Sequence, residues 1–257
     1  MAYVEILFAR KMFLWFASIV VIAGILIVAG AMSFPDHVHV SKTVGMPFGS
    51  VFSIAGYATC IMTTMIAATL NRDREHLPYM WSRPIPRERI AFGYMLVDAV
   101  TIVIAFFVVA ATATFVLENL SAFRLTPDPD AATGLLRYLA LPLMWYAVVE
   151  AATSWNSLKG SAVAGIAWAV FWILLGASAV RLPVVLSAIV GVLNIFNPLA
   201  YFVTRHGNSV LVDPVTLSKL GSQSIVPFSY GVQTVLAYAI FFTGCAIATF
   251  AWRRMEA

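Results

Sequence analysis

The sequence predicts an all-α integral membrane protein with six transmembrane helices. Hydrophobic residues make up 61% of its 257 residues and charged residues only 11%, whereas a soluble domain has about 25% charged residues. Six apolar segments reach about 20 residues, the length that crosses a bilayer as a helix. A helix is the expected form because every backbone polar group in hydrocarbon has to be hydrogen-bonded within its own segment.

The six expected spans follow one another closely, so residues 1–257 are expected to form a single membrane domain. The spans are residues 13–32, 48–70, 90–117, 135–153, 161–180 and 230–252. The first is too long for the apolar core of a signal peptide and is expected to be an uncleaved helix. Residues 2–12 before it mix apolar and charged side chains, which predicts a short amphipathic helix in the membrane interface. A simple extension of the first span is the alternative.

Residues 182–203 are also apolar, but Asn194, Asn197 and Pro198 interrupt them. They form either a seventh span or a re-entrant segment in an outer region of about 182–228. With six spans and cytoplasmic termini, ten of the 16 Lys and Arg residues lie inside, whereas a seventh span moves the terminal pair at 253–254 outside. The charges therefore favour a re-entrant segment, in a multi-pass protein of the plasma or inner membrane with both termini cytoplasmic.

The loop between the second and third spans, residues 71–90, carries the most specific pattern in the chain. It holds five basic residues among acidic and large apolar ones. Pro84 and Pro86 disfavour helix just before them, and Pro86 followed by Glu88 suits a helix N-terminus. The pattern predicts a short helix, a proline break and the start of the third span. A partner-docking loop explains these features, whereas an ordinary positive-inside loop does not explain the paired prolines.

Residues 77–93 resemble the ABC-2 family of exporter permeases. In that family an acidic residue precedes an element rich in serine, arginine and proline, followed by a glycine. The matching residues here are Asp73, Leu77, Ser82, Arg83, Pro84, Ile85, Arg87, Ile90 and Gly93. The chain departs from the family pattern at Glu75, His76, Pro86 and Tyr94. A second, weaker match at residues 196–201 resembles a family element that lies near outer re-entrant helices.

The resemblance implies that the 71–90 loop is a coupling helix that docks into a separate ATPase subunit. The residues expected to carry the coupling are Asp73, Leu77, Trp81, Ser82, Arg83, Pro84 and Arg87. Two ATPase subunits would bind ATP and Mg, and a second copy of this chain or a similar permease would complete the assembly in the lipid bilayer. The chain itself has no G-x-x-x-x-G-K-[ST] sequence, so it is expected to be neither an enzyme nor a cofactor binder. The implied activity is export of an amphipathic, lipid-like, drug or peptide substrate by alternating access.

Two acidic residues, Asp98 and Glu150, fall inside expected spans near the cytoplasmic side. Ionisable groups in spans are candidates for substrate contact or ion relay. Their shallow depth favours the alternative, in which they reach interfacial water or a basic neighbour. The other candidates are Trp168, Phe171 and Trp172 for the substrate path, where packing or lipid contact is the alternative, and Asn197, Pro198 and Tyr201 for an outer gate.

The remaining patterns give little information about function. The net charge of +4 is concentrated in loops and does not indicate nucleic-acid binding. His37 and His39 supply too few ligands for a metal site, and Cys60 and Cys245 fit apolar packing. An ion-coupled secondary transporter is a rival prediction that lacks midplane charges. A non-transporting accessory factor of an ATPase and a lipid-modifying membrane enzyme are further rivals, the latter without a catalytic constellation.

Overall fold

A computed structural model describes residues 2–33, 44–69, 86–119, 123–155, 160–180, 182–206, 209–212, 223–226 and 228–254. The chain is mostly helical, as predicted. Four stretches of helix are long and apolar enough to cross a membrane: Arg10–Gly30, Glu88–Asn119, Ala131–Ser154 and Tyr230–Trp252. They coincide with the first, third, fourth and last of the six expected spans.

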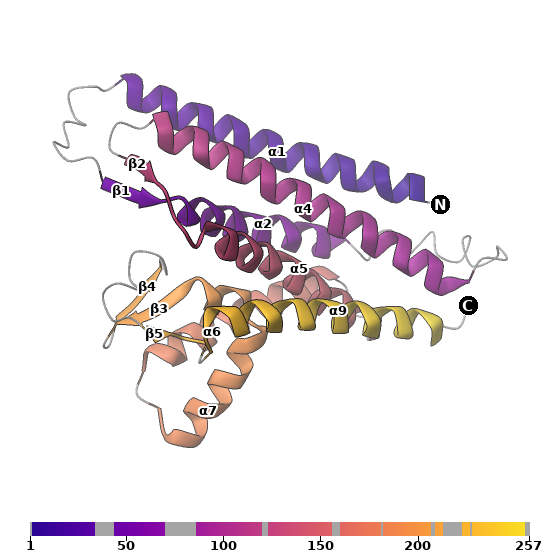
Figure 1. Ribbon diagram of the computed structural model, residues 1–257. Helices are drawn as coiled ribbons and strands as arrows, with labels where there is room; N and C mark the ends of the chain where they lie inside the picture. The colour runs from indigo at the N-terminus through magenta and orange to yellow at the C-terminus, as the bar shows by residue number, and fades with distance from the viewer. Residues whose placement is uncertain are drawn as a thin grey trace.

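The long helices run alternately in opposite directions (Figure 1). They are α1 (Ala2–Ser33), α2 (Gly49–Thr69), α4 (Arg87–Asn119), α5 (Ala131–Trp155), α6 (Gly160–Ala179) and α9 (Tyr230–Arg254). Both chain ends lie at one end of the bundle, which we name the terminal end. The strands gather at the opposite end, which we name the strand end.

The N-terminal segment differs from the expected interfacial helix. α1 is one uninterrupted helix of 32 residues, about 48 Å long at 1.5 Å per residue, and it packs mainly along α4. Residues 2–12 contain no proline or glycine that would end a helical turn. The extension of the first span, the alternative that the sequence allowed, is therefore the observed form.

The central helix is α5, which packs most extensively against α9 and α2. Residues 140–147 are buried without a break. Pro142 lies within this helix and cannot donate an N–H to the carbonyl of Tyr138, four residues earlier. Gly56 of α2 lies against that same carbonyl, and a Cβ on Gly56 would be 2.9 Å from the oxygen. The glycine therefore lets α2 approach α5 where a helical hydrogen bond is missing.

The all-α prediction missed five short strands. β1 (Val44–Pro47) pairs in parallel with β2 (Phe123–Thr126). β3 (Val203–His206) lies between β4 (Ser209–Val212) and β5 (Gln223–Ser224) and is antiparallel to both. Strands of two to four residues are too short for a hydrophobic alternation to be recognised in sequence.

The apolar stretch after α6 does not form a seventh long helix. α7 (Val184–Leu193) has only ten residues, none of them buried, and it projects away from the bundle (Figure 1). Two 3₁₀ turns follow, η3 (Asn194–Phe196) and η4 (Pro198–Tyr201). They return the chain to α5 and α6. A ten-residue helix is about half the length of a span.

Candidate functional site

The expected coupling residues lie almost entirely outside the described residues. This is so for Asp73, Leu77, Trp81, Ser82, Arg83 and Pro84, and for the side chain of Arg87. The described part begins at Pro86, whose carbonyl accepts hydrogen bonds from the Arg89 N–H at 3.0 Å and the Ile90 N–H at 3.4 Å. Glu88 lies in the first turn of α4. The predicted helix start after Pro86 is therefore confirmed.

The two acidic residues in the expected spans are both buried. Asp98 on α4 is 1% exposed and Glu150 on α5 is 4% exposed. This burial contradicts contact with interfacial water, because α4, α5 and α9 pack against one another. Contact with a basic neighbour stays a prediction. The Tyr146 hydroxyl donates to the Asp98 carboxylate at 2.9 Å. The Ser154 hydroxyl donates to the Glu150 carboxylate at 3.2 Å.

These groups form one acidic cluster, defined by Asp98, Tyr146, Glu150, Ser154 and Trp252. Tyr146 is hydrogen-bonded to Asp98, and Glu150 lies one helical turn after Tyr146 on the same face of α5. The Trp252 Nε1–H of α9 donates to the Ser154 hydroxyl oxygen at 3.0 Å. Buried carboxyl groups of this kind can hold a proton or receive a cationic group. Sequence reasoning missed Tyr146, although its spacing of four from Glu150 places both on one helix face.

The three aromatic residues proposed for the substrate path have two different environments. Trp168 and Phe171 of α6 pack on Trp145 of α5, with ring centroids 6.4 and 5.1 Å from it. The Thr64 hydroxyl oxygen of α2 accepts from the Trp145 Nε1–H at 3.0 Å and the Trp168 Nε1–H at 2.6 Å. Trp168 and Phe171 thus join helices α2, α5 and α6. Trp172, by contrast, is 57% exposed and is the one of the three available to lipid or a partner.

The residues proposed for the outer gate are held by a network of side-chain amides. The Asn197 Oδ1 accepts from the Leu199 N–H at 3.0 Å, which caps η4. Its Nδ2 donates to the Phe171 carbonyl at 3.2 Å and to the Asn194 Oδ1 at 3.0 Å. Asn194 in turn donates to the Ser178 hydroxyl at 2.9 Å. Irregular backbone is tolerated at membrane depth when protein groups satisfy it in this way.

Pro198 and Tyr201 are buried in η4 beside this network. The Tyr201 hydroxyl donates to the Ile195 carbonyl at 2.9 Å. The backbone carbonyl of Tyr201 accepts from the Arg137 Nη2 at 2.9 Å. The sequence analysis did not single out Arg137 as a candidate site residue.

Metal binding finds no support within the described ranges. In those residues no group of three His, Cys, Asp or Glu side chains is arranged to hold an ion, and His37 and His39 lie outside them. Cys60 and Cys245 are free thiols. Comparison of the chain with family models, with curated proteins and with solved structures finds no match. The functional assignment therefore has to come from the residues and their geometry.

Proposed function

We propose that this chain is the membrane subunit of an ATP-driven exporter of the ABC-2 type. In this proposal α1, α2, α4, α5, α6 and α9 are six transmembrane helices. α2 and α6 have 21 and 20 residues, about the number that crosses the hydrocarbon core. The segment from α7 to η4 enters the membrane from the outer side and returns. The chain lies in the plasma or inner membrane with both termini in the cytoplasm.

The observation that carries the proposal is where α4 begins. Figure 1 shows the start of α4 at the terminal end of the bundle, with both chain ends. The connection of residues 71–90 leads directly into this helix, and the basic pairs at 10–11 and 253–254 lie near the two chain ends. Arg87 and Arg89 in the first turn of α4 therefore lie at the same end as the two terminal pairs, as the positive-inside rule expects of a cytoplasmic side. This arrangement supports an ATPase partner that meets the terminal end.

The packing offers a route for mechanical coupling from the loop. A force on the 71–90 segment acts first on α4, which carries Asp98. The Asp98–Tyr146 hydrogen bond of 2.9 Å joins α4 to α5, and α5 packs against α9 and α2. A shift of α4 would thus reach the central helix. ATP and Mg would be bound by two partner ATPase subunits, and an amphipathic substrate would leave between this chain and a second permease.

Co-purification tests the proposal. The tagged chain is isolated from its native membrane, and the associated proteins and the rate of ATP hydrolysis are measured. A P-loop ATPase should co-purify with the natural chain. Arg83→Glu and Arg87→Glu should reduce its association or activity, whereas Arg124→Glu should not, because exposed Arg124 lies in β2 at the opposite end. A chain that purifies alone without ATP hydrolysis, or one indifferent to both loop substitutions, would refute the proposal.

An ion-coupled secondary transporter is the second candidate function. The acidic cluster favours it, because Asp98 and Glu150 are buried together between α4 and α5. It predicts substrate uptake or release by proteoliposomes of the pure chain under an imposed proton or sodium gradient. Asp98→Asn and Glu150→Gln would abolish that flux. An ATP-dependent flux that requires a co-purified ATPase would exclude this candidate.

A further inference from the structure

Arg137 on α5 is a buried cation at the strand end of the bundle. It is 5% exposed, and a guanidinium does not lose its proton in proteins. Its neighbours are neutral: the Tyr201 carbonyl at 2.9 Å, and the rings of Tyr230 and Tyr138 with centroids 4.0 and 5.3 Å from its Cζ. Its Nε has no hydrogen-bond partner, and no carboxylate in the described part of the chain pairs with it.

This arrangement leaves the charge of Arg137 without an anion. Burying a charge is unfavourable unless a counter-charge and hydrogen bonds compensate for the lost hydration. The carbonyl oxygen and the two rings compensate only part of that cost. The Nε edge of a guanidinium is also half of the fork that binds carboxylate and phosphate groups. The missing partner is therefore an anion that approaches the Nε edge.

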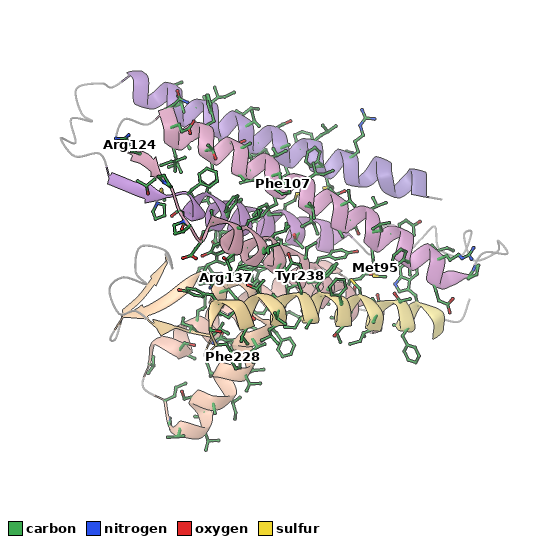
Figure 2. All side chains as sticks on the ribbon, viewed as in Figure 1. Met95, Phe107, Arg124, Arg137, Phe228 and Tyr238 are labelled. Carbon is green, nitrogen blue, oxygen red and sulfur yellow. The ribbon has the colours of Figure 1, made fainter. Side chains whose placement is uncertain are left out.

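The surroundings indicate which anion. Figure 2 shows Arg137, Phe228 and Tyr238 around the first turns of α9. Exposed apolar side chains occur on the same elements: Leu136 on α5, Phe228 just before α9, and Tyr230, Val232 and Val235 in its first turns. Aromatic residues at a helix end are typical of the membrane–water interface. An anion with apolar chains can place its charge on Arg137 and its chains along α9, whereas a free ion gains nothing from this surface.

We propose that Arg137 binds the phosphate group of an anionic phospholipid at the membrane interface beside the strand end, with Tyr230 as the ring that borders the group. Tyr230 is the first residue of α9 and is 40% exposed. The proposal requires that this ring turns aside to admit the phosphate group, which a side-chain rotation allows without breaking a helical turn. Beyond this, it requires only that the bundle lies in a membrane, and it does not depend on an ATPase partner or on export.

Thermal unfolding of the delipidated, detergent-purified full chain tests it. The midpoint is followed while phosphatidylglycerol, phosphatidylcholine with the same acyl chains, or inorganic phosphate is added. Phosphatidylglycerol should raise the midpoint of the natural chain. A hydrogen bond to a charged group is worth about 1.5–3 kcal/mol, so Arg137→Gln should need at least about tenfold more lipid for half of the effect. Arg124→Gln is the matched control: this exposed arginine lies at the same end of the bundle and should leave the response unchanged.

A second variant covers the case in which Arg137→Gln does not fold. Arg137→Lys keeps the positive charge but loses the planar fork, and it should also need more phosphatidylglycerol. A response of either folded variant equal to that of the natural chain would overturn the proposal, as would an equal effect of phosphatidylcholine. Inorganic phosphate that acts alone at the same concentration would overturn the assignment to a lipid and give the site to the free anion.

Discussion

Gly244 on α9 packs directly on the backbone of α5, so Gly244→Ala is expected to loosen the centre of the bundle. A Cβ at position 244 would lie 2.8 Å from the Ala147 carbonyl oxygen and 2.9 Å from the Ala147 Cβ. Carbon atoms in ordinary contact are about 3.5–4.0 Å apart. Neither of these atoms of Ala147 can rotate away, because both are fixed by the helix backbone. The two helices must therefore separate by roughly 0.6–1 Å at this point.

The magnitude follows from two opposing effects. Forcing an extra methyl group into a packed interior costs about 1–3 kcal/mol, whereas replacing glycine by alanine in a helix gains roughly 0.5–1 kcal/mol. Gly165 on α6 is exposed and a Cβ there would meet nothing within 4 Å. Gly165→Ala therefore shows the helix gain alone. The difference in free energy of unfolding between the two variants isolates the packing cost of about 1–3 kcal/mol.

The assay is unfolding of the purified chain in detergent by added SDS, followed by circular dichroism. Gly165→Ala should unfold at the same or a higher SDS fraction than the natural chain, and Gly244→Ala at a lower fraction than Gly165→Ala. The close α5–α9 packing would be refuted if Gly244→Ala were as stable as Gly165→Ala.

Three further substitutions test other hydrogen bonds, by SDS unfolding, by proteolysis and by hydrogen exchange. Thr64→Val leaves two indole N–H groups without their acceptor. It should lower the free energy of unfolding by about 1–3 kcal/mol relative to the control Thr64→Ser, which keeps the hydroxyl. Equal stability of the two variants would count against the shared hydrogen bond. Asn197→Asp keeps the Oδ1 that caps η4 but loses both amide donations. Proteolysis within residues 182–206 should therefore be faster than in the natural chain. An unchanged rate would argue against the amide network of Asn194 and Asn197. The Asp128 carboxylate caps the start of α2 by accepting from the Gly49 N–H at 3.1 Å. Asp128→Ala should therefore lower the free energy of unfolding by about 0.5–2 kcal/mol and speed hydrogen exchange in the first turn of α2. Unaltered exchange would exclude this cap.

Hydropathy and charge predicted the long apolar helices and the start of α4. The apolar runs that became α1, α4, α5 and α9 are long enough to cross a bilayer, and the start of α4 follows from Pro86 and Glu88. The prediction of a separate interfacial helix was wrong, because residues 2–12 have no feature that ends a helix and they continue into α1. The short strands were not predicted, because segments of two to four residues are too short to show a hydrophobic alternation in sequence.

The sequence by itself determined that this is a helical chain suited to a membrane, with its basic residues asymmetrically distributed. Only the tertiary structure decided which polar groups meet. Hydrogen-bonded partners are far apart in sequence: Asp98 and Tyr146 by 48 residues, Thr64 and Trp168 by 104, and Arg137 and the Tyr201 carbonyl by 64. The physical reason is that a helix apolar on every side has no face that hydropathy can orient. Close packing, as at Gly56 and Gly244, sets the rotation and axial offset of each helix. The rotation and offset then decide which buried polar atoms come within hydrogen-bond distance.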